Sequence, residues 1–164
     1  MKEINKKSAK PGTSLSAGGK ENYNFDSLIK DISTNTDNFS SLSTGHKLAI
    51  INEGIKKKDL KKIIFYTNTT TKQFTKYIHI TERTLQNKKD NDTLSQEASE
   101  RALLIVELYK KGEEVLGSKK IFKKWLDTEN ISLGGVTPES LLNSIFGIEF
   151  IRDMLGRIEY GMFA

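Results

Sequence analysis

The sequence predicts an all-α fold, in which a helix-turn-helix N-terminal half packs on a small helical C-terminal domain. Two observations carry this prediction. Apolar residues recur at helical spacing in successive segments after residue 40, and capping residues or glycines stand at the ends of these segments. Few residues remain for strands, although Ile131–Val136 suits a short extended contact. A chain of 164 residues is long enough for two small helical domains that need no disulfide bonds for stability.

Composition narrows the class of protein. Cysteine is absent, which excludes disulfides and any cysteine-based metal or nucleophile site. No apolar run follows the N-terminal lysines, and no stretch approaches the roughly 20 apolar residues of a membrane span, so a soluble cytoplasmic protein is expected. Residues 1–40 are rich in Lys, Ser, Gly and Asn, which predicts a largely disordered basic tail with one short helical pattern at Phe25–Ile32.

Residues 41–117 carry the patterns of the predicted helix-turn-helix domain. Thr70-x-x-Gln73 predicts a capping box that opens a helix of about two turns with Phe74 and Tyr77 inward. Two helices are expected before it: Thr44–Ile55, with Leu48, Ile51 and Ile55 at helical spacing, and Lys58–Asn68, with Leu60, Ile63 and Ile64 on the buried stripe.

The stretch Ile78-His79-Ile80 is predicted to form a turn whose two isoleucines point into the core. Thr81 can cap the next helix, Glu82 to about Lys89, with Leu85 facing inward. Two short helices within about twenty residues, the second exposing polar and basic side chains, are typical of a helix-turn-helix.

Charge separates the two halves of the chain. Between Lys56 and Lys89 ten basic residues stand against two acids, a balance of +8. From Trp125 to Ala164 six acids stand against two arginines, a balance of −4. The basic half suits the phosphates of DNA, whereas the acidic and apolar-rich half is expected to meet protein.

The second short helix is the expected DNA-reading element. Arg pairs bidentately with guanine, and Gln or Asn with adenine, while lysines hold phosphates and fix the register. The predicted DNA-binding residues are Lys72, Lys76, Thr81, Arg83, Thr84, Gln86, Asn87, Lys88 and Lys89. Taken alone, a basic run such as Lys56–Lys58 is usually just a solvated face.

A long helix is expected next, from Ser95 to Leu116, opened by Thr93-x-x-Gln96 and closed at Gly117. Its apolar residues cover more than one stripe, which predicts packing on both halves of the molecule. Ser118–Leu126 should form a further helix, whose expected inward residues are Ile121, Phe122 and Trp125. Trp125 is interpreted as a core residue rather than a contact.

The segment Leu133-Gly134-Gly135-Val136 predicts a tight turn before a short helix. Thr137 is expected to cap that helix, with Pro138 at its first position. Val136 and Leu141 are expected to form a hydrophobic staple, and Gly147 to end the helix as a left-handed C-cap. A last helix is predicted with its inward stripe at Ile148, Ile151, Leu155 and Ile158.

These C-terminal motifs carry a family resemblance. The string WL-x(6)-LGG-x-TP-x-x-LL at Trp125–Leu142 and the closing LGRIE-x-G-x-FA at Leu155–Ala164 resemble the C-terminal toxin-binding domain of Xre/MbcA/ParS antitoxins. Several separated motifs match in the right order. Upstream, Leu60–Gly117 resembles the helix-turn-helix half of the same family, mainly through Ile80-Thr81-Glu82-Arg83-Thr84-Leu85.

The resemblance implies an antitoxin of a type II toxin–antitoxin system. Its partner would be a RES-domain toxin, a class that binds and consumes NAD, and residues 118–164 would cover the toxin's active site. The helix-turn-helix half would bind the operon's own promoter as an autoregulator, in a homodimer that matches two half-sites. The implied toxin-binding residues are Leu133, Gly134, Gly135, Arg152, Gly156, Arg157, Glu159, Tyr160, Gly161, Met162, Phe163 and Ala164.

Several residues of the implied toxin site also have a purely structural interpretation. Gly134 and Gly135 first of all allow the backbone to make a tight turn. Gly156 costs roughly 1 kcal/mol relative to alanine inside a helix, which close approach of another backbone or a partner would justify; the alternative is that the helix simply tolerates it. By analogy with the family, Arg157 and Glu159 would position the tail through charge pairs. The aromatic and Met residues of Tyr160–Phe163 suit protein-interface anchors, and Gly161 lets the tail bend into a cleft.

Catalysis is not expected. His46 and His79 lack neighbours at metal-ligand spacing and are interpreted as structural, and no nucleophile, Walker, HExxH or paired-carboxylate motif occurs. No cofactor is expected. Two other roles stay open: a stand-alone helix-turn-helix regulator whose C-terminal half only dimerises, and a scaffold or localisation factor.

Overall fold

The computed structural model describes residues 43–162 of the chain. Its α-helices are α2 (Thr44–Glu53), α3 (Lys57–Tyr66), α4 (Thr71–Tyr77), α5 (Glu82–Asn87), α6 (Gln96–Leu116), α7 (Lys119–Asp127) and α8 (Ile145–Glu159). Two 3₁₀ turns, η1 (Ile131–Leu133) and η2 (Pro138–Leu141), join α7 to α8. Within residues 43–162 extended pairing is limited to isolated bridges, Lys56 with Thr93 and Asn130 with Val136. The all-α prediction is confirmed for this part of the chain.

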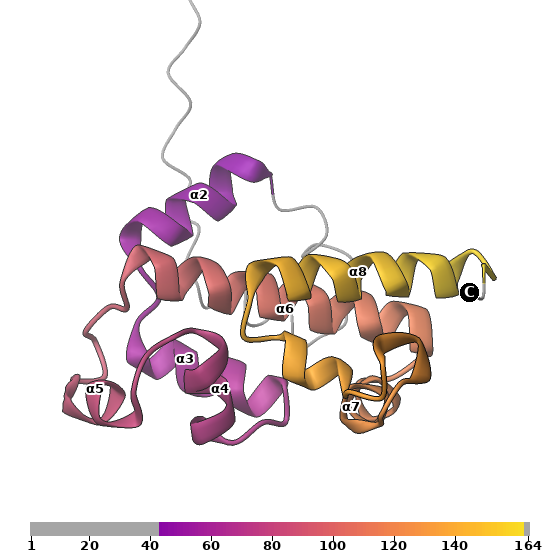
Figure 1. Ribbon diagram of the computed structural model, residues 1–164. Coiled ribbons are helices and arrows are strands. Elements are labelled where there is room, and N and C mark those ends of the chain that lie inside the picture. Colours follow the sequence, from indigo (N-terminus) through magenta and orange to yellow (C-terminus); the bar gives the residue numbers. More distant parts are fainter. Residues whose placement is uncertain (1–42, 163–164) are drawn as a thin grey trace, which may run out of the picture.

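Helix α6 is the centre of the molecule. It packs against α2, α3 and α4 of the N-terminal half and against α7 and α8 of the C-terminal half. In Figure 1, α8 lies along α6. Helices α3 to α5 group together below one end of α6, and α7 lies below the other end of α6. The expected packing of the long helix on both halves is therefore confirmed.

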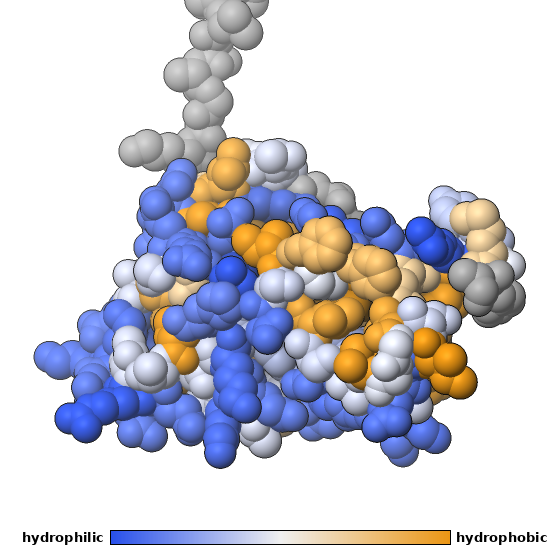
Figure 2. Space-filling model, in the orientation of Figure 1, coloured by the Kyte–Doolittle hydropathy of each residue, from blue (hydrophilic) through white to orange (hydrophobic). Residues whose placement is uncertain are grey.

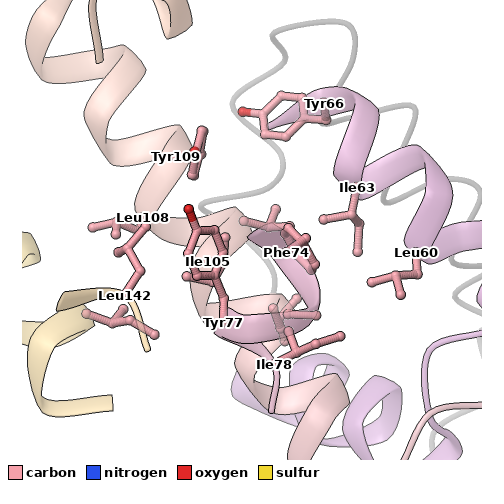
Figure 3. Packing of buried hydrophobic residues seen from close by; sticks show 14 of the residues in the cluster. Leu60, Ile63, Tyr66, Phe74, Tyr77, Ile78, Ile105, Leu108, Tyr109 and Leu142 are labelled. Atoms are coloured by element: carbon pink, nitrogen blue, oxygen red, sulfur yellow. The ribbon is translucent and has the colours of Figure 1, made fainter. Parts of the chain in front are cut away.

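One continuous core joins the two halves. In Figure 3, Phe74 and Tyr77 of α4 lie between the α3 side chains and Ile105 and Leu108 of α6. The ring of Tyr109 on α6 meets Phe122 of α7 edge to face, with centroids 5.1 Å apart. The Tyr109 hydroxyl is buried with no hydrogen-bond partner among the described residues, and its burial raises the pKa of this phenol.

Local signals position most helix ends. The Thr70–Gln73 capping box is formed, and the Thr81 hydroxyl caps α5 by accepting the Thr84 N–H. Gly117 ends α6 in the left-handed conformation, at φ 85°. The start of α6 differs from the prediction, because Ser95 rather than Thr93 is the capping residue and accepts the Ala98 N–H.

Two inward assignments need correction. Leu48 is 52% exposed, and Ile50, two residues on, is the buried residue of α2. Ile121 is 54% exposed, whereas Phe122 and Leu126 are the buried residues of α7. Helical spacing places several apolar residues near one face, but only the neighbouring helices decide which part of that face is covered. Trp125 is half-buried and stacks on Phe122, with centroids 5.9 Å apart.

The junction before α8 was predicted wrongly. Thr137 makes no side-chain cap, although Pro138 does take the first position of η2. Gly147 does not end a helix: it lies in the first turn of α8, where its N–H donates to the Ser144 hydroxyl. A Cβ on Gly147 would lie 2.1 Å from the Leu141 carbonyl oxygen. The glycine therefore permits close packing of α8 on η2.

Candidate functional sites

Helices α4 and α5 form the expected helix-turn-helix. Ile78 and Leu85 are buried beneath the pair, and His79 in the turn has a positive φ of 55°. The His79 Nε2 lies 2.6 Å from the Asn143 carbonyl oxygen, which can only accept, so the imidazole must be the donor. A left-handed backbone conformation is unfavourable for a residue other than glycine. At His79 this conformation accompanies a hydrogen bond to the segment just before α8.

Most of the predicted DNA-binding residues are exposed. Arg83, Gln86 and Asn87 of α5 are exposed, as are Lys72 and Lys76 of α4. Their spacing leaves Leu85 alone to anchor α5 in the core. The structure therefore presents these side chains outward from a short, capped helix.

Some members of the predicted set have internal roles. The Thr81 and Thr84 hydroxyls lie 2.8 Å apart and belong to the cap of α5. The Lys89 N–H donates to Asp92 Oδ2 at 2.7 Å, although its side chain is exposed. Lys88 is half-buried at the C-cap of α5. Arg83, Gln86 and Asn87, by contrast, are exposed on α5.

The lysines of α3 are less available for contact with DNA phosphates than the charge count implies, because several of them bind other groups of the protein. The Lys61 ammonium pairs with Asp90 at 2.7 Å and lowers the pKa of that carboxyl, chiefly through their hydrogen bond. Lys62 pairs with Asp59 at 3.1 Å. The Lys57 ammonium donates to the Lys88 and Gln86 carbonyl oxygens. Hence part of the positive charge of this half serves its own fold.

The C-terminal half carries a different surface. Phe146, at the start of α8, is 78% exposed, and its ring stacks on Phe150 one turn later, with centroids 6.5 Å apart. Further exposed apolar side chains are Ile121, Ile131, Val136, Ile145, Tyr160 and Met162. We call these eight residues the apolar surface. Figure 2 shows hydrophobic residues gathered over the region of α8, whereas the region of α5 is hydrophilic.

The loop between α7 and η2 is closed on itself. Asn130 and Val136 form a backbone bridge, and the Gly135 N–H donates to the Asn130 carbonyl oxygen at 3.0 Å. Gly134 and Gly135 have φ values of 75° and 83°, which confirms their backbone role. Ile131, the first residue of η1 within this loop, is 95% exposed. The loop therefore presents an apolar side chain from an ordered turn.

The predicted toxin-binding residues divide into two groups. Arg152 lies 3.4 Å from Glu107, and Glu159 pairs with Lys111 at 2.7 Å, so both side chains attach α8 to α6. Leu133 is half-buried. The exposed group is Gly134, Gly135, Arg157, Tyr160, Gly161 and Met162, with Gly156 partly exposed, whereas Phe163 and Ala164 lie outside the described residues.

Sequence reasoning missed Ile131, Ile145, Phe146 and Phe150. A signal was present, because Ile145–Ile151 reads IFGIEFI and is apolar on almost every side of its helix. A helix of that kind must cover more than one apolar neighbour. In the monomer only Gly147, Ile148, Ile151 and Leu155 of α8 are buried, so the remaining apolar face stays open.

A second contact joins the two halves beside the turn. The Tyr77 hydroxyl of α4 donates to Glu139 of η2, and burial together with this bond raises the pKa of the phenol. With the His79–Asn143 bond, it holds the helix-turn-helix against the segment that leads into α8. The two candidate surfaces therefore belong to one packed body.

Comparison with known families agrees with this arrangement. Residues 47–107 match the antitoxin Xre-like helix-turn-helix domain, and residues 111–161 match the antitoxin Xre/MbcA/ParS C-terminal toxin-binding domain. No curated protein matches the sequence significantly. Among the described helices none is both long and apolar enough to cross a membrane. Two antitoxin domains thus follow one another along residues 47–161, and the chain belongs to the Xre/MbcA/ParS family of antitoxins.

Proposed function

We propose that this antitoxin neutralises a RES-domain toxin by covering the toxin's NAD-consuming active site with its C-terminal segment. It also binds the promoter of its own operon through α5, as a homodimer, and so represses its own synthesis. It acts by binding alone and performs no catalysis. The identity of the toxin class rests on the family resemblance of Trp125–Leu142 and Leu155–Ala164.

The observation that carries the proposal is the distribution of exposed apolar side chains. Of the ten large apolar side chains that are exposed within residues 43–162, eight lie between Ile121 and Met162. Scattered apolar residues are normal on a monomer, but a concentration in one half indicates a protein-binding surface. The half in question is the one matched by the toxin-binding domain.

The end of α8 supplies the segment that would enter the toxin. Tyr160 and Met162 are 76% and 58% exposed, and Gly161 turns the chain between them at φ 66°. The Met162 N–H donates to the Arg157 carbonyl oxygen at 2.8 Å, which keeps this turn close to the helix. An apolar group presented on an ordered turn costs little entropy on binding. In the proposed complex these side chains exclude the dinucleotide sterically.

The DNA-binding role rests on charge and geometry together. Arg83, Gln86 and Asn87 are exposed on α5, and Lys72 and Lys76 are exposed on the preceding helix α4. A recognition helix of six residues reads few bases, so a homodimer on two half-sites about 34 Å apart supplies the remaining affinity. The acidic C-terminal half, with its balance of −4 after Lys124, is directed away from DNA.

Deleting Tyr160–Ala164 should abolish neutralisation. The deletion removes the apolar end of the chain but leaves α8 through Glu159, including its ion pair with Lys111. Co-expression of toxin and truncated antitoxin should arrest growth and deplete cellular NAD, while promoter binding in a gel shift stays unchanged. Full protection by the truncated chain would contradict the proposed covering by the tail.

Arg83→Ala should weaken promoter binding by about 1–3 kcal/mol and relax the preference for one base, because a bidentate base contact is lost. Lys88→Ala should weaken binding to all duplexes alike. A gel shift with promoter and scrambled DNA measures both effects, and a toxin pull-down serves as the folding control. If both variants shift DNA like the wild type, α5 does not face the duplex.

A stand-alone regulator is the second candidate, favoured by the same apolar surface, which could instead join two copies of the chain. The two roles separate in solution. If the tail-deleted chain stays dimeric but loses toxin binding, the surface belongs to the toxin. If it becomes monomeric and no toxin binds the intact chain, the surface serves dimerisation.

A further inference from the structure

Lys57, in the first turn of α3, contacts the far end of the recognition helix. Its ammonium donates to the Lys88 carbonyl oxygen at 2.6 Å and to the Gln86 carbonyl oxygen at 3.2 Å. The side chain is half-buried between α3 and α5. The last carbonyls of a helix have no partner within it and carry partial negative charge, so a cation there is favourable.

Helix α5 has few other constraints at that end. It comprises six residues, Leu85 is its one buried residue, and its Thr81 cap acts at the opposite end. The Lys88 N–H returns to the Leu85 carbonyl at 3.3 Å, a long hydrogen bond. The Lys57 ammonium is thus the contact from another helix that reaches the C-terminal carbonyls of α5.

The backbone around Lys57 belongs to the same connection. Lys56 offers no side-chain cap to α3, and the Lys57 and Lys58 N–H groups donate instead to the Asp92 and Asp90 carbonyl oxygens, at 2.9 and 3.0 Å. The segment after α5 therefore caps α3, while Lys57 of α3 caps α5. This reciprocal arrangement leaves the Lys57 charge facing carbonyl oxygens of its own chain.

We propose that Lys57 is a positioning residue for DNA recognition. Its ammonium holds the C-terminal end of α5 against α3 and so sets the direction of Gln86 and Asn87, and it binds no phosphate itself. This inference rests on the proposed DNA-binding function of α5. It assigns one member of the basic run Lys56–Lys58 to the geometry of the reading helix.

The test is the salt dependence of DNA binding. Lys57→Met keeps the aliphatic stem and removes the donor. Its affinity for the labelled DNA upstream of the gene should fall about 10-fold, a typical effect of losing hydrogen bonds from a charged group. Its affinity for an unrelated duplex should fall less. The slope of log K against log salt should equal that of the wild type, since each lost phosphate contact changes it by about 0.9.

Matched variants complete the design. Lys58→Met removes the same charge from the exposed neighbouring position and measures the effect of charge alone. Lys57→Arg can donate to both carbonyls and should restore the preference for promoter DNA. Circular dichroism checks the fold, and if Lys57→Met does not fold, Lys57→Gln, which keeps a neutral donor, takes its place with a smaller expected loss.

The possible results are distinct. No preference of the wild type for promoter DNA would remove the proposed function and this inference with it. With a specific wild type, equal behaviour of Lys57→Met and Lys58→Met would overturn the positioning role alone. A shallower salt slope for Lys57→Met would also overturn it, because it would show a direct phosphate contact.

Discussion

Replacing Phe146 and Phe150 together by alanine should abolish toxin binding. The two rings stack on each other along α8 and are 78% and 38% exposed, so Phe146 contributes little to the monomer's core and Phe150 is partly covered by it. A buried aromatic anchor at an interface contributes about 2 kcal/mol or more, which is roughly 30-fold in affinity for each ring. Titration calorimetry with purified toxin measures the loss, and growth in co-expression shows its consequence.

Phe65→Ala is the matched control. Phe65 is 88% exposed on α3, in the helix-turn-helix half. The Phe65→Ala variant should therefore bind toxin with the affinity of the wild type. All variants should remain folded, which urea unfolding checks, and the midpoint of Phe65→Ala should equal that of the wild type. If the double variant binds toxin with unchanged affinity, α8 does not contact the toxin, and any neutralisation depends on the tail alone.

Gly147→Ala should cause a large loss of stability, because a side chain at this position collides with η2. Its Cβ would lie 2.1 Å from the Leu141 carbonyl oxygen and 2.9 Å from the Leu141 Cβ, and backbone atoms cannot move aside as a flexible side chain can. The helix must therefore shift away from η2. Overpacking of this kind costs about 3 kcal/mol. Urea unfolding followed by circular dichroism gives the change in the free energy of unfolding.

Gly156→Ala provides the comparison within the same helix. No atom of the described chain outside the neighbouring helical backbone lies within 4 Å of a Cβ placed there. Alanine should therefore raise the free energy of unfolding by about 1 kcal/mol through helix propensity. Equal losses for the two glycines would contradict the role assigned to the Leu141 contact.

Gly156→Ala also tests the toxin interface. The chain itself does not need a glycine at this position, so the observed residue is explained if the toxin's backbone approaches α8 there. In that case the variant is more stable and yet binds toxin more weakly. Unchanged toxin affinity would leave Gly156 as a residue that the fold tolerates.

Local patterns predicted most helices because short-range chemistry determines their ends. The Thr70–Gln73 box, the Thr81 cap and the Gly117 C-cap each involve residues at most four positions apart, and all three are formed. The exposure of the polar residues of α5 was likewise predicted from helical spacing, with Leu85 as the inward residue. Their assignment to DNA contact stays a prediction until binding is measured.

The errors occurred where distant segments meet. Gly147 carries the sequence signal of a helix end, but its real constraint is a carbonyl six residues earlier, in another element. Lys56–Lys58 reads as a solvated run, and Lys56 and Lys58 are indeed exposed, but the Lys57 ammonium donates to the Gln86 and Lys88 carbonyl oxygens. Neither contact has a local sequence pattern, because the backbone carbonyls that make it are common to all residues.

By itself, then, the sequence determined the helical class, the helix-turn-helix, the opposite charges of the two halves and the family motifs, since these follow from residue types at fixed spacing. Only the tertiary structure decided which apolar side chains stay uncovered, such as Phe146 and Ile131, and which charges are paired within the fold, such as those of Lys57 and Glu159. Burial and pairing depend on neighbours from other helices, and those neighbours are defined only when the chain packs around α6.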